Sequence, residues 1–200
     1  VEKKIADTPP EFFTNMEASD NTGKVLLSSL VPSWDNTRGT FDPYVTVYDA
    51  SCYTEDQAAF IPSKMEGYRP NQESLSQLAY AVETTDLPTW LSGDASVGKS
   101  SLVQYLCHIT GRPFRRANFN GQTAYEDIIG KNSLTAGELT YHEGIVPETM
   151  RIPHGILLLD EPTAAPAEIQ LALQFALERN GKLLLANKPS ATKDAFVEPA

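Results

Sequence analysis

The sequence is poor in the residues that build disulfide frameworks and zinc centres. Its 200 residues include two cysteines, Cys52 and Cys107, and three histidines. The cysteines form no C-x-x-C pair and the histidines show no ligand spacing, so we expect neither a disulfide scaffold nor a zinc site. Cys107 falls within an apolar helical pattern and is predicted to be a small buried hydrophobe.

Long apolar runs and positive charge are also scarce. No stretch approaches the ~18 uncharged apolar residues of a membrane span, and the first residues lead into no apolar segment typical of a secretory signal. We therefore expect a cytoplasmic protein without membrane contact. The 16 Lys and Arg residues against 26 Asp and Glu residues give a net charge of −10. This balance disfavours nucleic acid as a partner, because a broad phosphate-neutralising face is missing.

The overall composition is typical of a globular protein. The composition also changes along the chain and divides it into two parts. Hydrophobic residues make up 41% and charged residues 21%, enough for one real core. Residues 1–60 carry turn signals, with short strand candidates at 25–27 and 44–48. We predict an arm or small subdomain over 1–60, which is an adaptor segment, a strand-rich subdomain or partly disordered. Residues 61–200 form the second unit.

From residue 61 onward the pattern alternates between helix and strand. Helices are predicted over 71–83, 100–109 and 166–179, and strands over 88–92, 115–120 and 155–160. The strand at 155–160 is almost entirely apolar, which is typical of a strand covered on both faces. Strands that alternate with helices predict an α/β fold with a parallel sheet and flanking helices.

The stretch from Gly93 to Ser100 matches the G-x-x-x-x-G-K-[S/T] phosphate-loop pattern, between a predicted strand and a predicted helix. Glycines let the backbone wrap around phosphates, and the helix start supplies free N–H groups and partial positive charge. Lys99 is predicted to reach the β- and γ-phosphates, and Ser100 to ligate Mg²⁺. Asp94 adds a negative charge to the loop and is expected to point outward. The residues predicted to bind ATP are Gly93, Asp94, Ala95, Ser96, Val97, Gly98, Lys99, Ser100 and Ser101.

An acidic pair, Asp160 and Glu161, follows the apolar strand about 60 residues after the loop. A carboxylate at the end of a strand can hold Mg²⁺ through water, and an adjacent carboxylate can polarise an attacking water. We predict that Asp160 joins Ser100 at the magnesium ion. Glu161 is predicted to be catalytic together with Lys99.

Two families of phosphate-loop ATPases have sequence segments that are similar to parts of this chain. Residues 158–165, LLDEPTAA, resemble ABC-type ATPases, but the LSGGQ-like signature and the room for a helical insertion are both missing. The spacing instead resembles AAA+ ATPases of the MoxR type, which include the small ATPase subunit of cobaltochelatase and dynein-related modules. The segments that carry this resemblance are residues 118–120, 125–131, 137–147, 160–179 and the lead-in helix at 61–82.

The resemblance covers about residues 61–200 and implies a partial AAA+ core that binds ATP and Mg²⁺. The chain ends at Ala200, before the strand that carries the polar sensor residue in this family. The family hydrolyses ATP to remodel a partner or insert a metal, acts as a ring of subunits, and often works with a partner bearing a von Willebrand A domain. Residues 137–147 resemble its inserted hairpin, which lies near the ring's pore.

Two other interpretations remain open. One is a nucleotide-dependent scaffold that hydrolyses little ATP, a reading that the arm and Pro162, directly after the acidic pair, would suit. The other is a kinase-like transferase, which needs arginines over its phosphates. Arg112, Arg115 and Arg116 are the candidates for that role, and Arg179 is the candidate for an arginine supplied to a neighbouring subunit.

Overall fold

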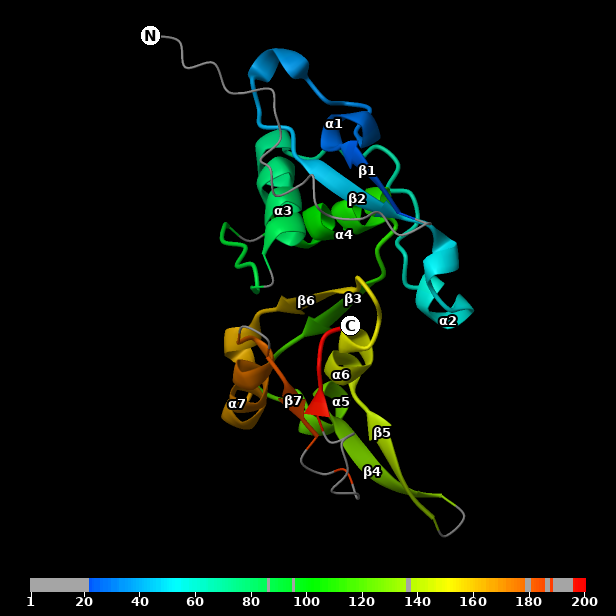
Figure 1. Cartoon of the computed structure of the whole chain (residues 1–200). Coiled ribbons are helices and arrows are strands. Elements are labelled where there is room, and N and C mark those ends of the chain that lie inside the picture. Colours follow the sequence, from blue (N-terminus) through cyan, green and yellow to red (C-terminus); the bar gives the residue numbers. More distant parts are fainter. Residues whose placement is uncertain are drawn as a thin grey trace.

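The centre of the molecule is a parallel pair of strands held between two layers. The computed structural model describes residues 22–85, 87–94, 96–135, 138–178, 181–185, 188 and 196–200. Strands β3 (Phe114–Asn118) and β6 (Ile156–Asp160) pair in parallel. Helices α3 (Gln72–Thr84) and α4 (Lys99–Thr110) lie on one side of this pair, and α5 (Tyr125–Ile128), α6 (Ile145–Met150) and α7 (Ala167–Ala176) lie on the other (Figure 1). The predicted α/β fold, a parallel sheet with flanking helices, is confirmed.

Strand β6 is apolar on both faces because each face meets a different core. Ile156 and Leu158 pack against an upper core built on α3 and α4. Leu157 and Leu159 pack against a lower core built on α5, α6 and α7. Successive side chains of a strand point to opposite faces, so a run of four apolar residues serves two layers at once.

Local sequence explains both helices of the upper layer. The Asn71 side chain caps α3 by accepting a hydrogen bond from the Ser74 N–H at 2.9 Å, at the position where the predicted helix 71–83 begins. Gly111 ends α4 in a left-handed conformation, with φ 67°, which its missing Cβ permits. The buried residues of the two helices are Gln72, Leu75, Ser76, Leu78, Ala79, Leu102, Val103, Tyr105, Leu106, Cys107 and Thr110. Cys107 is fully buried, as predicted.

Residues 22–60 form short elements that pack on the upper core. Strands β1 (Thr22–Leu26) and β2 (Tyr44–Tyr48) pair antiparallel, with α1 (Leu27–Leu30) between them and α2 (Glu55–Ala58) after them. Leu27 and Val45 are almost completely buried, and both belong to the upper core. Residues on both sides of position 60 therefore share one core, and the division into two units stays a prediction.

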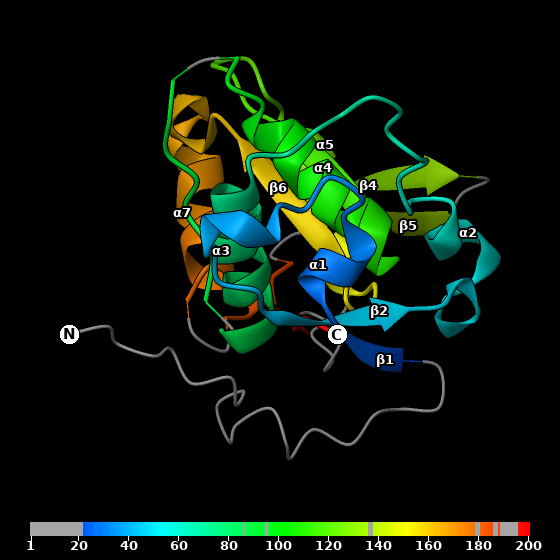
Figure 2. The same cartoon turned by 90° about the horizontal axis from the view of Figure 1, so that it is seen from above.

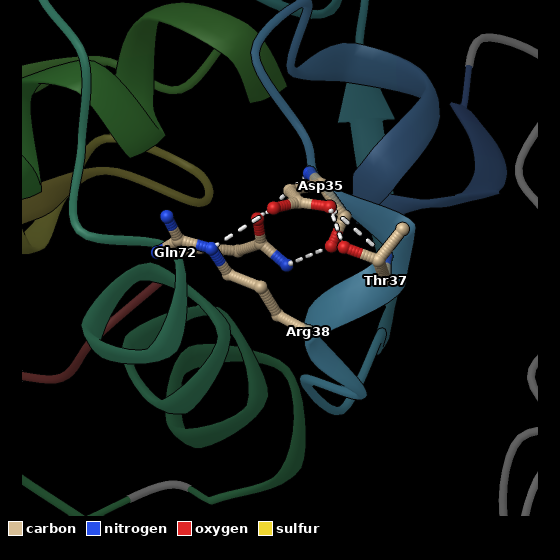
Figure 3. Close-up of polar contacts among 4 residues, drawn as sticks. All are labelled: Asp35, Thr37, Arg38 and Gln72. Atoms are coloured by element: carbon tan, nitrogen blue, oxygen red, sulfur yellow. Dashed lines mark hydrogen bonds and ion pairs between the residues drawn. The ribbon is translucent and has the colours of Figure 1, made fainter.

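A polar junction ties this N-terminal region to the start of α3. The backbone N–H of Asp35 donates to Oε1 of Gln72 at 2.9 Å, and the Gln72 amide donates back to the Asp35 carbonyl at 3.2 Å (Figure 3). The Asp35 carboxylate accepts from Thr37 and pairs with Arg38 at 3.0 Å. These hydrogen bonds lower the pKa of Asp35, those from Thr37 most.

The predicted strand at 88–92 is wrong. Residues 88–92 lie in no strand, and Trp90 is 73% exposed. A strand needs a neighbour for its backbone groups, and no described strand pairs with this segment. Leu87, Leu91 and residues 156–158 of β6 instead line one cavity of about 880 Å³. In the described part of the chain, β6 is paired along one edge and borders this cavity.

The hairpin predicted at 137–147 is displaced in the structure. Strands β4 (Gly130–Thr135) and β5 (Glu138–Glu143) pair antiparallel, and Ile145 already begins α6. Pro147 is the third residue of α6, in the first helical turn, where its missing N–H removes no hydrogen bond. The hairpin extends from the lower layer (Figure 1).

The remaining elements are small. Strands β7 (Leu183–Leu184) and β8 (Phe196–Val197) pair antiparallel beside α7. No helix among the described residues is long and apolar enough to cross a membrane. Residues 1–21 of the arm, Ala95 of the loop, Gly137 and Arg179 lie outside the described residues.

Candidate functional site

The predicted phosphate loop runs directly into α4. Gly98 precedes the helix with φ 89°, a conformation that L side chains rarely adopt, and no side chain caps the helix start. Ser96 also has a positive φ of 65°. Among the described residues, no side chain caps the first N–H groups of α4 at this end. A helix start of this kind offers N–H donors and partial positive charge to an anion.

The Lys99 ammonium contacts the first residues of this loop. Its Nζ donates to the carbonyl oxygens of Gly93 and Asp94, each at 2.8 Å. The Asp94 residue is exposed. A lysine that is held by two loop carbonyls sits where phosphates would be cradled, and phosphate oxygens can replace those carbonyls as its acceptors.

A pocket of about 320 Å³ adjoins the loop. Residues from α3, from the loop and from the segment before it form its wall. They are Tyr68, Asn71, Ser74, Gln77, Leu78, Thr89, Trp90, Leu91, Ser92, Val97, Gly98, Lys99 and Leu102. Its volume falls at the lower end of the range for small-molecule sites. Burial raises the pKa of Tyr68, which packs on Tyr105 with ring centroids 5.3 Å apart. Sequence reasoning missed Tyr68, which lies outside the loop motif.

The acidic pair lies at the carboxyl end of β6, on the same side of the molecule as the loop (Figures 1 and 2). Ile156 and Leu158 face the upper core, so strand alternation directs Asp160 to the face that α4 covers. Glu161 has a left-handed backbone, with φ 54°, and Pro162 starts a 3₁₀ turn directly after it. Among the described residues, no hydrogen bond or ion pair joins Asp160 or Glu161 to the loop.

Asp160 has a partner that the sequence did not reveal. Its Oδ2 pairs with Nη2 of Arg116 on the neighbouring strand β3. Arg115 pairs instead with Glu148 at 2.7 Å, and Arg112 with Glu83 at 2.5 Å. The three clustered arginines thus enter three separate ion pairs. Their spacing alone could not show this, because every partner is at least 29 residues away in the chain.

The oxygen donors at this end of the sheet suit magnesium. The candidate ligands are the hydroxyl of Ser100, in the first turn of α4, and the carboxylate of Asp160. Mg²⁺ prefers oxygen ligands, keeps several waters, and is commonly held by one or two protein carboxylates together with substrate phosphates. One hydroxyl and one carboxylate beside a phosphate loop fit this coordination preference.

Comparison with known proteins identifies the family. The profile of the AAA domain, dynein-related subfamily, matches residues 88–196, which is more than half of the chain. The chain belongs to this family. The matched range contains the phosphate loop, the hairpin and the acidic pair together. The prediction of an AAA+ ATPase of the MoxR and dynein-related type is therefore confirmed.

Three curated relatives show how far the similarity extends. Midasin of Dictyostelium discoideum is 34% identical over 115 residues, 57% of this chain and 2% of midasin. Mouse von Willebrand factor A domain-containing protein 8 is 26% identical over 105 residues, 52% of this chain and 5% of that protein. Protein NorQ of Paracoccus denitrificans is 30% identical over 94 residues, 46% of this chain and 34% of NorQ. The chain thus spans at most about a third of these relatives' own lengths.

Proposed function

We propose that this AAA domain binds Mg²⁺-ATP at the loop of residues 93–101 and hydrolyses it to ADP and phosphate. The observation that carries the proposal is the Lys99 ammonium, held by two loop carbonyls at the uncapped start of α4. Membership of an ATPase family supports the same assignment.

Each part of the site has a role in this proposal. The N–H groups at the start of α4 bind the phosphates, and Lys99 exchanges its carbonyl acceptors for β- and γ-phosphate oxygens. Mg²⁺, held by Ser100 and Asp160, would neutralise charge that develops on the phosphates. Glu161 orients and polarises the attacking water. The pocket that Tyr68 and Trp90 line adjoins the loop and is a place for the base of the nucleotide.

The proposal extends from nucleotide binding to the assembly in which this domain works. We propose that ATP turnover there remodels a partner protein or drives metal insertion, within a homo-oligomeric ring. A neighbouring subunit would supply the arginine that stabilises transition-state charge, an effect worth about 10³ to 10⁵ in rate in other phosphate-loop systems. The name of the mouse relative includes a von Willebrand A domain, which supports a partner or attached domain of that type.

Replacing Lys99 tests nucleotide binding. We expect Lys99→Ala to weaken ATP binding at least tenfold, about 1.4 kcal/mol, because the ammonium donates to two loop carbonyls, where the proposal places the phosphates. The fold should survive, since Lys99 makes its two hydrogen bonds on the exposed loop. Lys131→Ala on β4 is the matched control and should keep the wild-type affinity. A fluorescent-nucleotide titration that finds equal affinities for wild type and Lys99→Ala would remove the loop from the site.

A scaffold that binds ATP and turns it over slowly is the second candidate. Two observations favour it: Asp160 is engaged by Arg116, and Pro162 follows a Glu161 with a left-handed backbone. The Glu161→Gln variant separates the two functions. For an ATPase, phosphate release should collapse while ATP binding survives. For a scaffold, the slow phosphate release of the wild type should be unchanged by the substitution.

A further inference from the structure

Arg116 is the cation that pairs with Asp160 in the described part of the chain, and its position follows from the register of the sheet. Arg116 lies opposite Leu158, and Asn118 lies opposite Asp160. Residues in register on parallel strands point to the same face, and Leu158 faces the upper core. Ala117, between Arg116 and Asn118, is 3% exposed and belongs to the lower core. Arg116 and Asp160 therefore share the face on which α4 and the phosphate loop lie.

The ion pair between them is open to solvent on one side. The Arg116 side chain is 44% exposed and that of Asp160 is 26% exposed. A pair of this exposure is weak and exchangeable, unlike a fully buried pair. It also uses a carboxylate oxygen of the residue that the proposed function assigns to Mg²⁺. The positively charged guanidinium and a magnesium ion would therefore repel each other and compete for the charge of the same carboxylate.

We propose that Arg116 is a positioning residue that occupies the Asp160 carboxylate until Mg²⁺ arrives with the nucleotide. This inference rests on the proposed function. In the metal-free site, Arg116 cancels the Asp160 charge, so phosphates approach the loop without repulsion from that carboxylate. With the nucleotide bound, the Asp160 carboxylate would hold Mg²⁺, and the Arg116 guanidinium would turn toward solvent on its partly exposed side.

The consequence is a specific coupling between metal and nucleotide. Without Arg116, the bare carboxylate of Asp160 repels a metal-free nucleotide, while Mg²⁺ has no competitor. Arg116→Gln should therefore weaken nucleotide binding in EDTA about two- to fivefold, the range of a partly exposed ion pair. It should leave binding in Mg²⁺ equal to that of the wild type or tighter.

The experiment is a titration of the 200-residue chain with methylanthraniloyl-ATP, once in EDTA and once in Mg²⁺. The measured quantity is the dissociation constant in EDTA divided by the dissociation constant in Mg²⁺. We expect Arg116→Gln to raise this ratio about two- to fivefold. Arg116→Lys, which keeps the charge, should stay near the wild-type ratio. Paramagnetic resonance with Mn²⁺ as the probe, in the presence of ADP, should show tighter metal binding by Arg116→Gln.

A thermodynamic cycle identifies the carboxylate through which Arg116 acts. In an Asp160→Asn background, Arg116→Gln should change the ratio no further, because the charge that it neutralises is gone. Arg115→Gln is the matched control on the same strand. Arg115 pairs with Glu148, so its removal should leave the ratio unchanged. Thermal melting followed by circular dichroism checks that each variant is folded, and Arg116→Met is the second variant if Arg116→Gln unfolds.

Three outcomes would overturn the proposal. An unchanged ratio in Arg116→Gln would show that the ion pair has no influence on metal binding. Equal weakening in EDTA and in Mg²⁺ would make Arg116 a phosphate contact or a structural residue. If the wild type binds neither the ATP analogue nor tripolyphosphate, the proposed function itself fails and the role of Arg116 fails with it.

Discussion

The ion pair between Arg112 and Glu83 is the most buried charged contact among the described residues, and its loss should destabilise the protein strongly. The two side chains are 9% and 6% exposed, with Nη2 and Oε1 at 2.5 Å. Thr46 donates to the other Glu83 oxygen at 2.9 Å, and the Arg112 guanidinium lies 4.7 Å from the Tyr48 ring centroid. The pair thus joins β2, α3 and the turn after α4.

The perturbation is Glu83→Gln, which keeps the shape of the side chain and removes its charge. Arg112 would then be a buried cation without a counter-ion, and removing one partner of a buried pair costs about 3 to 5 kcal/mol. That is a large part of the ~5 to 15 kcal/mol that stabilises a typical protein. For a chain of this size, the expected fall in melting temperature is about 10 °C.

Urea unfolding followed by circular dichroism measures the change in the free energy of unfolding. The double variant Glu83→Leu with Arg112→Met should lose less than Glu83→Gln, because no uncompensated charge stays buried. Arg38→Gln breaks an exposed pair, with side chains 68% and 41% exposed, and should cost less than about 1 kcal/mol. If Glu83→Gln costs no more than Arg38→Gln, burial does not decide the strength of these pairs and the reasoning is refuted.

Three further predictions concern other parts of the molecule. Burial raises the pKa of Cys107 to about 12, so Ellman's reagent at pH 8 should modify Cys52 in the native protein and reach Cys107 only after unfolding. Burial, with the nearby charge of Arg112, lowers the pKa of His154 from 6.5 against a smaller opposing effect of Glu83. The folded state therefore favours the neutral ring, so this contribution to the free energy of unfolding should be full above about pH 6.5 and be lost as the pH falls below it. Urea unfolding of His154→Asn at several pH values should show a free energy of unfolding that depends less on pH than that of the wild type. Deleting residues 131–142 should leave nucleotide affinity unchanged, because the β4–β5 hairpin and the loop lie in different layers (Figure 1); loss of ATP binding would instead place the hairpin in the core.

The sequence predicted the elements that local signals define. Asn71 marks the start of α3, Gly98 and Gly111 bracket α4, and the apolar run before Asp160 is a strand covered on both faces. In each case a cap, a turn or a periodic pattern carries the information within a few residues. The phosphate loop and the acidic pair were located for the same reason.

Features that depend on distant partners were missed or misplaced. The segment at 88–92 has strand-like residues, but a strand exists only where another strand pairs with it. Strand β4 is rich in polar residues, and its pairing with β5 rather than its composition makes it a strand. The engagement of Asp160 by Arg116 joins positions 44 residues apart, and nothing local marks it.

The edge of β6 that borders the 880 Å³ cavity has a consequence for handling the protein. The described residues include no strand that pairs along this edge. An apolar strand with a free edge is a template for any extended chain that meets it, including a second molecule of the same protein. Self-association through this edge would grow with concentration, and added salt would favour it by screening the repulsion between two molecules of net charge −10. The titrations above should therefore be done with dilute samples. A separate peptide that pairs with this edge as a strand would also keep the chain monomeric.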